Sequence, residues 1–457
     1  MELTKSKKAN INYLAKIVEV KEFYDIIGAD RLKHAYVDGY KIVISKESQP
    51  GLYVYFPTNC TINPEYLSYH NLYRHSNLNK DNTQSGMFDD NGRVKTIKLI
   101  KGTVLSEGFL MPLVALQNFI VDNLQVELND VKSNTEFDQV EHDGKSFWIN
   151  KKYVPKVQQG SGNHNTPRGK QPKGLDKLVD GQFRFHYDTV IIKKVPTAIN
   201  PDDLIHISEK IHGTSGISAY VLCKKKLNLF GKIKKLFKKD YEELDYDYIY
   251  SSRTVVKNRY YNKNVGSGYY GVDVWGEADK YLRPYLEKGM TFYYEIVGYL
   301  PTGSYIQKDY DYGCVTPKAN EQYTPEKHFK VRIYRITLTN VDGKVHEFSA
   351  REVQQYCKMH GLTPVKELYY GYAKDLYPEL DRSEHWHMNF IEALANDKER
   401  FYMEENSPSC TNTVPHEGIV IKSENMRSEA FKLKCFNFLN KEQKELDKGE
   451  TNVEDEA

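Results

Sequence analysis

The sequence predicts an α+β protein in which a small β-barrel is followed by a larger domain of sheets and helices. Three observations support this fold class. The first ~120 residues form a series of short strand-like runs, residues 155–175 are rich in Gly, Pro, Gln and Asn, and residues 181–440 mix strand-like with helix-like patterns. The predicted divisions are a barrel domain at 1–125, a partly disordered linker at 126–180, a second domain at 181–440 and an acidic tail at 441–457.

The composition excludes several classes of protein. The chain has 457 residues, enough for two or three domains, with 40% hydrophobic and 28% charged residues. No apolar run approaches the ~18 residues that a membrane-spanning helix needs, and the first residues lead into no apolar segment of the kind found in secretory signals. We therefore expect neither a transmembrane protein, nor a wholly disordered one, nor a secreted one.

Cysteine usage indicates a reducing cytoplasm. The six cysteines lie far apart and include no Cys-x-x-Cys pair, which argues against a disulfide scaffold and against a structural zinc site.

The formal net charge of +2 comes from 64 basic and 62 acidic residues and does not by itself indicate a polyanionic partner. The 36 tyrosines favour extensive sheet structure, and they also supply flat surfaces on which bases stack.

The N-terminal strands are short and are separated by turn residues. Two of them flank Asp38-Gly39, a dipeptide typical of a two-residue hairpin. Several short strands within about 100 residues are typical of a small barrel such as an OB-fold. Such a barrel either binds nucleic acid or only packs against a neighbouring domain, and the residues do not decide between the two. The strand-like runs are 14–20, 35–37, 40–44, 52–56, 93–100 and 108–113.

Two helices and a charged tail are predicted further along the chain. Ser349 and Glu352 are spaced as a capping box, so a helix is expected to begin after Ser349. Residues 224–239 contain eight lysines and no acid, and their apolar residues fall at helical spacing, which predicts a basic amphipathic helix. It would contact nucleic acid or a membrane surface, or it would be a solvated insertion whose charge is offset by the acids at 240–247. The tail at 441–457 has seven acids and three lysines and is expected to be solvated and frayed.

The stretch 209–213, with the sequence EKIHG, carries the strongest chemical signal. It follows the apolar strand-like run 204–207. A lysine at a strand–turn junction beside glycine presents its amine to a phosphate without steric hindrance. To act as a nucleophile Lys210 must lose a proton, and at the ordinary lysine pKa only roughly 1 in 2,500 amines is neutral at pH 7. Burial or a neighbouring cation would raise that fraction.

The same Lys-x-His-Gly pattern occurs twice, so the pattern alone is weak evidence. Its second copy, Lys358 to Gly361, follows a helical run that begins near Ser349, and Gly361 is therefore predicted to be a helix C-cap. Only the first copy lies between two strand-like segments. We therefore assign the candidate nucleophile to Lys210.

Further chemically useful side chains follow in strand-like segments. They comprise an arginine for a ribose or phosphate, two carboxylates, an aromatic ring on which a base could stack, and two lysines on alternate residues of one strand. Two lysines on one strand face favour an anion such as an α-phosphate. Each segment, taken singly, is more often ordinary sheet. The segments are 251–254 with Arg253, 292–298 with Glu295, 331–336 with Tyr334, 417–422 with Glu417, and 431–434 with Lys432 and Lys434.

In this order and spacing, the segments resemble the nucleotidyltransferase motifs of covalent polynucleotide ligases and mRNA capping enzymes. The stretch EKIHGT at 209–214 is especially similar to RNA ligase 2-type enzymes, and the region ending in 93–113 resembles the OB domain that precedes the ligase module in the RNA ligase 5 group. The resemblance covers most of the chain and is weakest at the linker and at 351–410. The matching stretches are motif I at Lys210–Gly213, motif Ia at Ser252–Arg253, motif III at Glu295–Gly298, motif IIIa at Ile333–Ile336, motif IV at Glu417–Lys422 and motif V at Lys432–Lys434.

The resemblance implies an ATP-dependent RNA ligase whose second domain is an ATP-grasp-like adenylyltransferase module of antiparallel sheets with helices. Lys210 would attack the α-phosphate of ATP and form lysyl-AMP, AMP would pass to a 5′-phosphate on RNA, and a 3′-hydroxyl would displace it. The implied catalytic residues are Lys210, Lys432 and Lys434. The implied nucleotide-binding residues are Glu209, Ile211, His212, Gly213, Arg253, Glu295, Tyr334 and Glu417, together with Lys432 and Lys434.

The resemblance also implies a cofactor and a partner. Glu295 and Glu417 would hold Mg²⁺ or Mn²⁺. The partner would be RNA, as a nicked duplex or as broken ends, in RNA repair. A monomer without membrane contact is expected, in the cytoplasm, with a virus or a phage as a candidate source.

Two residues depart from the family pattern. Many members have Asp two residues after the lysine, where it helps to bind a hydrated metal, and here His212 stands at that position. The metal is therefore expected on Glu295 and Glu417. Motif IIIa usually has an acid where Arg335 stands, so the adenine contact of Tyr334 depends on the aromatic ring alone.

Two short segments allow both a functional and a structural interpretation. In 183–189, Arg184 and His186 would meet a phosphate, or the segment would be a lid or a packed strand. Thr214 and Ser215, directly after the candidate nucleophile loop, would contact the same ligand or stabilise the turn.

Other functions share part of this evidence. A capping guanylyltransferase or an ordinary ATP-dependent DNA ligase would have a C-terminal OB domain, whereas only 23 residues follow Lys434. A non-enzymatic RNA-binding relative would be favoured by loss of Lys210, Glu417 or Lys432, and all three are present.

Overall fold

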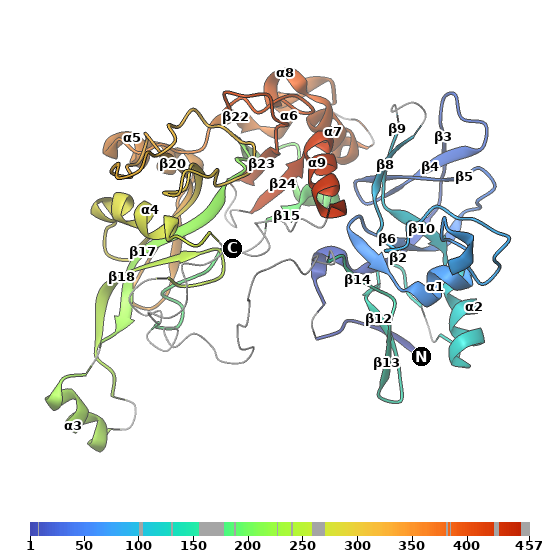
Figure 1. The fold of residues 1–457 in the computed structure, drawn as a ribbon, viewed down its shortest axis with the longest axis horizontal. Helices are drawn as coiled ribbons and strands as arrows, with labels where there is room; N and C mark the ends of the chain where they lie inside the picture. Colours follow the sequence, from blue (N-terminus) through green and yellow to red (C-terminus); the bar gives the residue numbers. More distant parts are fainter. Residues whose placement is uncertain are drawn as a thin grey trace. The chain divides into compact units, whose positions relative to one another are not determined.

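The computed structural model describes residues 1–7, 9–99, 104–128, 131–154, 178–186, 189–225, 227–238, 241–257, 270–380, 383, 385–424 and 429–448. The chain divides into two units (Figure 1). One comprises Met1–Lys156 with Lys193–Pro196, and the other comprises Val157–Ile192 with Thr197–Ala457. Within the described ranges, no helix is long and apolar enough to cross a membrane.

The first unit consists of short antiparallel strands and helices around an apolar core. Its elements are β1 (Glu2–Thr4), β2 (Ala15–Val20), β3 (Tyr24–Asp25), β4 (Leu32–Val37), β5 (Tyr40–Ser45), β6 (Gly51–Phe56), β7 (Cys60–Ile62), α1 (Pro64–Tyr69), β8 (Thr96–Leu99), β9 (Val104–Glu107), β10 (Phe109–Pro112), α2 (Leu113–Leu124), β11 (Glu136–Phe137), β12 (Gln139–His142), β13 (Lys145–Trp148) and β14 (Asn150–Lys152). Asp38 and Gly39 form the predicted two-residue turn between β4 and β5, and Asp38 has a positive φ of 51°. Buried side chains of β2, β6 and α2, including Ile17, Val54 and Phe119, build the centre of the core.

The described strands of this unit do not form the closed barrel that the sequence predicts. They divide into small sheets with the orders β1-β12-β13, β10-β6-β2-β11, β14-β7, β3-β4-β5 and β8-β9. A barrel needs every strand to pair on both sides, and no pairing among the described residues joins the edge strands β10 and β11. The sequence analysis also missed α2, whose buried residues Leu113, Leu116 and Ile120 have helical spacing directly after a strand.

The first unit extends beyond the predicted barrel domain. Residues 136–152, which the sequence analysis placed in the linker, form β11 to β14, and these strands pair with β2, β1 and β7. The physical reason is burial, because Phe137, Val140 and Ile149 are fully buried in the core of this unit although polar residues surround them in the sequence. The Gly- and Pro-rich part of the predicted linker, 155–175, lies outside the described residues.

The described strands of the second unit form two five-stranded sheets. They are β15 (Val190–Ile191), β16 (Leu204–Glu209), β17 (Thr214–Lys224), β18 (Leu244–Ser252), β19 (Met290–Gly298), β20 (Phe329–Thr339), β21 (Val345–Glu347), β22 (Glu367–Tyr372), β23 (Gly418–Ser423) and β24 (Ala430–Lys434). The β16 sheet has the order β15-β24-β23-β16-β22, and the β19 sheet has the order β18-β17-β19-β20-β21. Apart from the parallel pair β15 and β24, the pairings are antiparallel, which confirms the predicted α+β class.

Two helices cover one face of the β19 sheet. The helices of this unit are α3 (Leu229–Phe237), α4 (Val274–Leu282), α5 (Ala350–His360), α6 (Ala373–Leu376), α7 (Trp386–Asn396), α8 (Lys398–Phe401) and α9 (Phe436–Asp447). Trp275 of α4 and Tyr356 of α5 share one core cluster with Phe292 of β19. The predicted capping box of α5 is present, and Gly361 is its left-handed C-cap with a φ of 66°. Because these helices cover one face, alternate residues of β19 and β20 are left to face the β16 sheet.

The segment after β24 is only partly a tail. The sequence analysis predicted a frayed tail from residue 441, but α9 continues to Asp447. The helix is held by the buried Phe438 and by an ion pair of 3.1 Å between Lys434 Nζ and Glu442 Oε1. Residues 449–457 lie outside the described part of the chain.

Candidate active site

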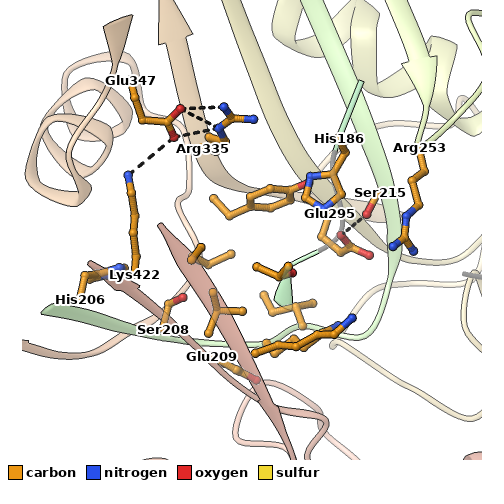
Figure 2. Close-up of a pocket in the computed structure, with 18 residues that line it drawn as sticks. His186, His206, Ser208, Glu209, Ser215, Arg253, Glu295, Arg335, Glu347 and Lys422 are labelled. Atoms are coloured by element: carbon orange, nitrogen blue, oxygen red, sulfur yellow. Dashed lines mark hydrogen bonds and ion pairs between the residues drawn. The ribbon is translucent and has the colours of Figure 1, made fainter. Parts of the chain in front are cut away.

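A cavity lies between the two sheets of the second unit (Figure 2). One wall comes from β16, β23 and β24, and the other comes mainly from β17, β19 and β20. Figure 2 shows His186, Arg253 and Glu295 toward one end of this cavity. Arg335, joined to Glu347, lies toward the opposite end.

The register of the β16 sheet places polar side chains in rows along the cavity wall. His206 of β16 lies opposite Lys422 of β23, and Ser208 lies opposite Val420. Val420 in turn lies opposite Lys432 of β24. Because alternate residues of a strand point to the same face, all five side chains line the cavity.

Lys210 lies at the end of β16, where its amine meets a buried carboxylate. The Lys210 Nζ is 2.5 Å from Oε1 of Glu417, whose side chain is fully buried. The Nζ of Lys434 lies 3.3 Å from the same oxygen. The backbone N–H of Lys210 donates to the carbonyl oxygen of Gly418 at 2.8 Å, which holds the two motifs together. A single carboxylate therefore contacts two lysine amines.

Two glycines allow strands to approach closely around Lys210. Gly418 has a φ of +136°, and a Cβ there would lie 2.1 Å from the carbonyl oxygen of Leu433 in β24. A Cβ on Gly213 would lie 2.5 Å from the carbonyl oxygen of Ile296 and 2.7 Å from Cγ of Glu295. Since real Cβ atoms do not come this close, a larger residue would push the strands apart. Gly213 therefore serves the packing of β17 on β19.

The opposite wall carries a carboxylate, an arginine and an aromatic ring. The β17–β19 register pairs Ser215 with Glu295, and the Ser215 Oγ donates to Oε2 of Glu295 at 3.0 Å. Arg253 follows β18 and lines the cavity near Glu295. The hydroxyl of Tyr334 lies 3.4 Å from Nδ1 of His186. Burial raises the pKa of Tyr334, so this ring stays neutral and offers an apolar surface.

Positive charges converge on His186. Its pKa is lowered to about 3, first by burial and then by the cationic side chains of Arg253, Arg335, Lys210 and Lys432. A histidine with this pKa is neutral at pH 7. The effect of these cations on a partly buried imidazole indicates a positively charged cavity that attracts an anion.

At the end of the cavity opposite His186, Glu347 is ion-paired with Arg335 and Lys422. Arg335 donates to both carboxylate oxygens of Glu347 at 2.7 to 2.9 Å, and its guanidinium lies 4.4 Å from the ring centre of Tyr293. The Nζ of Lys422 donates to the carbonyl oxygen of Phe348 at 2.7 Å and lies 3.9 Å from Glu347. Burial lowers the pKa of Lys422, while Glu347 acts in the opposite direction. Arg335 is thus paired with an acid of the neighbouring strand β21.

The cavity brings together most of the residues that the sequence analysis expected there. Those lining it are Glu209, Lys210, Ile211, Arg253, Glu295, Tyr334 and Lys432. Glu417 and Lys434 are not among the lining residues: Glu417 contacts Lys210, and Lys434 contacts Glu417. The Glu209 carboxylate accepts a hydrogen bond of 2.6 Å from Ser409, and burial raises its pKa. Glu209 therefore helps to anchor the loop around residue 409.

His212 lies outside the cavity lining. Its ring packs edge-on against Tyr310 and Phe438, with ring centres 4.7 and 4.9 Å away. Its backbone N–H donates to the hydroxyl of Tyr312 at 3.1 Å, and the same hydroxyl donates to its carbonyl oxygen at 2.8 Å. Its Nδ1 is 3.7 Å from Oε2 of Glu417. His212 is therefore placed to position Glu417.

Several lining residues were left open or missed by the sequence analysis. His186 and Ser215 line the cavity, whereas the guanidinium of Arg184 donates to a backbone carbonyl elsewhere in the unit. Residues 206 and 208 could have been predicted to line the cavity, because alternate residues of a strand point to the same face as Lys210. Glu347 had no such signal, because it reaches the cavity from a neighbouring strand of the β19 sheet.

The described residues contain no group of three or more His, Cys, Asp and Glu side chains that could by itself hold a metal ion. A metal ion bound here would therefore need oxygen atoms of a bound nucleotide in addition to protein side chains. Mg²⁺ commonly binds in this way, through one or two carboxylates plus the phosphates of a substrate. Glu295 lines the cavity and fits this role. Glu417, already in contact with Lys210 and Lys434, fits it less well.

Comparisons with known proteins identify the fold. No protein-family model and no curated protein sequence matches the chain. A mutant RNA ligase of Naegleria gruberi with ATP and Mn is 16% identical with a TM-score of 0.52, over 94% of this chain and 98% of that chain. A mutant form with AMP and Mn is 15% identical with a TM-score of 0.51, over 94% and 98%. The same ligase with pyrophosphate is 16% identical with a TM-score of 0.50, over 95% and 100%. At this identity the likeness establishes a shared fold.

Proposed function

We propose that this protein is an ATP-dependent RNA ligase that forms a lysyl-AMP intermediate on Lys210. The observation that carries the proposal is the convergence of Lys210, Lys432 and Arg253 on one cavity, where cations lower the pKa of His186. The fold shared with an RNA ligase that is known with ATP, AMP and pyrophosphate supports the same assignment.

The cavity suits a nucleotide in one orientation. Apolar side chains that include Ile211 and Val365 offer a surface for a purine base, and Tyr334 offers a ring for stacking. The phosphates would lie toward Lys210 and Lys432, where positive charge is concentrated. The ion-paired end of the cavity would then meet the polar edge of the base.

In the proposed first step, the Lys210 Nζ forms a bond to the α-phosphorus of ATP. The bond from that phosphorus to the bridging oxygen breaks, and pyrophosphate leaves with the electron pair. Nζ must lose a proton in this step, and Oε1 of Glu417 at 2.5 Å is placed to take it. Lys432 would stabilise the negative charge on the phosphate oxygens. Lys434 shares Oε1 of Glu417 and so weakens the hold of this carboxylate on the ammonium of Lys210.

A divalent metal is part of the proposal. Mg²⁺ or Mn²⁺ would supply further neutralisation of the phosphate charge. Glu295 would hold it, with Glu417 as the second candidate. The proposed ligand set therefore consists of protein carboxylate and nucleotide oxygen.

The partner proposed for the later steps is RNA. AMP would pass from Lys210 to a 5′-phosphate, and a 3′-hydroxyl would then displace it and seal the strand, in the repair of a nick or of broken ends by a monomer. The first unit is proposed as an RNA-binding part. In support, β3 and β4 carry the clustered rings of Tyr24, His34 and Tyr36, and the Nζ of Lys41 lies 5.5 Å from the Tyr36 ring.

Self-labelling tests the proposed nucleophile. Incubation with a divalent metal and ATP radiolabelled at the α-phosphate is expected to label the protein, whereas Lys210→Ala should take up no label. The control is Lys358→Ala, which alters the second Lys-x-His-Gly copy on α5 and should label like the unchanged protein. Label on Lys210→Ala, or its loss from Lys358→Ala, would contradict the assignment of Lys210. Labelling by GTP in place of ATP would favour a guanylyltransferase.

Sealing assays identify the substrate. A panel of nicked duplexes with RNA or DNA at each strand is expected to be sealed only when an RNA strand is present. Sealing restricted to nicks in DNA would assign the protein to DNA ligation. Labelling without any sealing of nicks or of single-stranded ends would limit the function to nucleotidyl transfer.

A further inference from the structure

The proposed ligase chemistry does not use α3. This helix follows β17 and precedes β18, and Figure 1 shows it at the end of that hairpin, away from α4 and α5. It begins at Asn228, whose side-chain oxygen accepts a hydrogen bond of 2.8 Å from the backbone N–H of Gly231. None of its described side chains lines the cavity. Its role must therefore be sought at the surface.

The apolar side chains of α3 are exposed on one face of the helix. The exposed fraction is 74% for Leu229, 75% for Phe230, 45% for Ile233, 83% for Leu236 and 89% for Phe237. At 100° per residue, these five positions fall within an arc of about 120°. Single exposed apolar residues are common on proteins, but such a group on one face marks an interaction surface. A purely solvated insertion explains the lysines of this segment and leaves the apolar face unexplained.

Apart from Gly231, the remaining positions of α3 in the sequence are lysines. Two of the acids that follow the helix pair with lysines that precede it: the Lys224 Nζ lies 2.8 Å from Glu242, and the Lys225 Nζ lies 3.3 Å from Asp245. These pairs neutralise the ends of β17 and β18. The lysines of the helix and of its C-cap stand at positions 232, 234, 235 and 238.

We propose that α3 docks the protein on the surface of an anionic lipid membrane. The helix would lie in the plane of the surface, with its apolar face at the boundary of headgroups and acyl chains and its lysines beside lipid phosphates. With nine residues it is too short to span a bilayer. This proposal replaces the expectation of no membrane contact and takes the membrane-surface alternative that the sequence left open for residues 224–239.

Other occupants match only part of this surface. RNA would attract the lysines of α3 and could stack bases on Phe230 and Phe237, but it would leave the aliphatic side chains of Leu229, Ile233 and Leu236 in water. A second copy of the chain would cover the apolar face but would bring two lysine-rich helices together. An anionic membrane satisfies both the apolar face and the charge.

Vesicle sedimentation of the full chain tests the proposal. The protein is expected to sediment with phosphatidylcholine vesicles that contain phosphatidylserine, and not with phosphatidylcholine alone. Lys234→Gln with Lys238→Gln should weaken binding about 30-fold, since each lysine near an anionic surface contributes about fivefold. Phe230→Ser with Leu236→Ser should abolish sedimentation. Met359→Ser, which removes an exposed apolar side chain of α5, is the matched control and should bind like the unchanged protein.

The outcomes separate this proposal from its rivals and from the proposed ligase activity. Absence of binding to anionic vesicles, or full binding by the Phe230→Ser and Leu236→Ser double variant, would overturn it. It would equally be overturned if vesicles did not bind and the lysine variant weakened RNA binding with a flatter salt dependence. Loss of a dimer in the apolar variant would assign the face to self-association instead. All α3 variants should take up the AMP label normally, so a failure of the ligase proposal would be seen separately.

Discussion

Lys432 and Lys434 occupy the same face of β24 but meet different partners. Lys432 lines the cavity with Lys210, whereas Lys434 lies 3.3 Å from Oε1 of Glu417 and 3.1 Å from Oε1 of Glu442. Lys432 is therefore a candidate catalytic residue. Its contact with Glu417 makes Lys434 a candidate positioning residue that would act through this carboxylate. Their alternation along the strand predicts a shared face but does not separate these roles.

Alanine at these two positions should have different kinetic effects. Lys432→Ala removes a cation from the phosphates, and is expected to slow self-labelling on the order of 100-fold and to raise KM for ATP. In Lys434→Ala, Lys210 is the one remaining lysine of this pair in contact with Glu417. The carboxylate then stabilises the ammonium of Lys210 more strongly, and the amine loses its proton less readily. The labelling rate should fall with little change in KM, and half-maximal labelling should move to higher pH. Initial labelling rates over ranges of ATP concentration and pH measure both effects.

A surface lysine provides the control for this pair. Lys280→Ala breaks an exposed i,i+3 ion pair with Glu277 on α4 and should label normally. The same change in KM from both Lys432→Ala and Lys434→Ala would contradict the separate roles. So would an unchanged pH profile in Lys434→Ala.

At the scale of elements, the site depends on how closely β23 and β24 approach each other. Gly418 starts β23 directly after Glu417, and its neighbour across the pair is Lys434. Its carbonyl oxygen also accepts the hydrogen bond from the backbone of Lys210. One glycine thus sets the spacing of three elements: the strand end that carries the proposed nucleophile, the strand after the buried Glu417, and the strand of the two lysines.

Gly418→Ala is expected to inactivate the site, whereas Gly361→Ala is expected to leave it active. The new Cβ would lie 2.1 Å from the carbonyl oxygen of Leu433 and would separate β23 from β24. A displacement of about 1 Å in an active site can reduce the rate about 100-fold, so at least that loss of labelling is expected. Gly361→Ala is the control, because Gly361 also has a positive φ but no atom within 4 Å of the new Cβ.

The control variant should lose only about 1–2 kcal/mol of stability through backbone strain and should keep its labelling rate. Thermal unfolding of both variants distinguishes loss of fold from loss of geometry. Normal labelling by Gly418→Ala would show that the close approach of the strands is not needed for the reaction.

At the scale of the whole molecule, buried histidines of the second unit should make it sensitive to acid. Burial lowers the pKa of His186 to about 3 and those of His206 and His416 to about 4. In the unfolded chain these groups titrate near their ordinary value of about 6.5. Between these values the unfolded state binds more protons than the folded state, so the free energy of unfolding falls as pH drops below about 6.5. Glu209, with its raised pKa, acts in the opposite direction.

Urea unfolding at pH 7 and at pH 5 is expected to show a lower midpoint at pH 5. His206→Gln should reduce the difference between the two midpoints, because it removes one of the groups that titrate only on unfolding. The neighbours of His206 are Glu367 at 3.4 Å together with the cations Lys422 and Arg351. His346→Gln, at an exposed position in the same unit, should leave the difference unchanged. A midpoint that rises toward pH 5, or an equal effect of both substitutions, would contradict this account.

Local sequence patterns determined part of the candidate site. The glycine after the Lys210 loop, the apolar run before it and the alternation of Lys432 and Lys434 describe short segments that behave the same way in any sheet. The α5 helix is predicted for a similar reason, because a capping box and a C-cap glycine involve only a few neighbouring residues. The choice of Lys210 over Lys358 followed from these local patterns.

Only the tertiary structure decided which side chains meet. It brought Glu347 from β21 to Arg335, placed Lys434 behind Glu417, turned the ring of His212 away from the cavity and drew β11 to β14 into the first unit. It also left the apolar face of α3 exposed, where the sequence predicted only that such a face exists. The physical reason is that register, strand pairing and burial depend on partners tens to hundreds of residues away, and local periodicity carries no information about those partners.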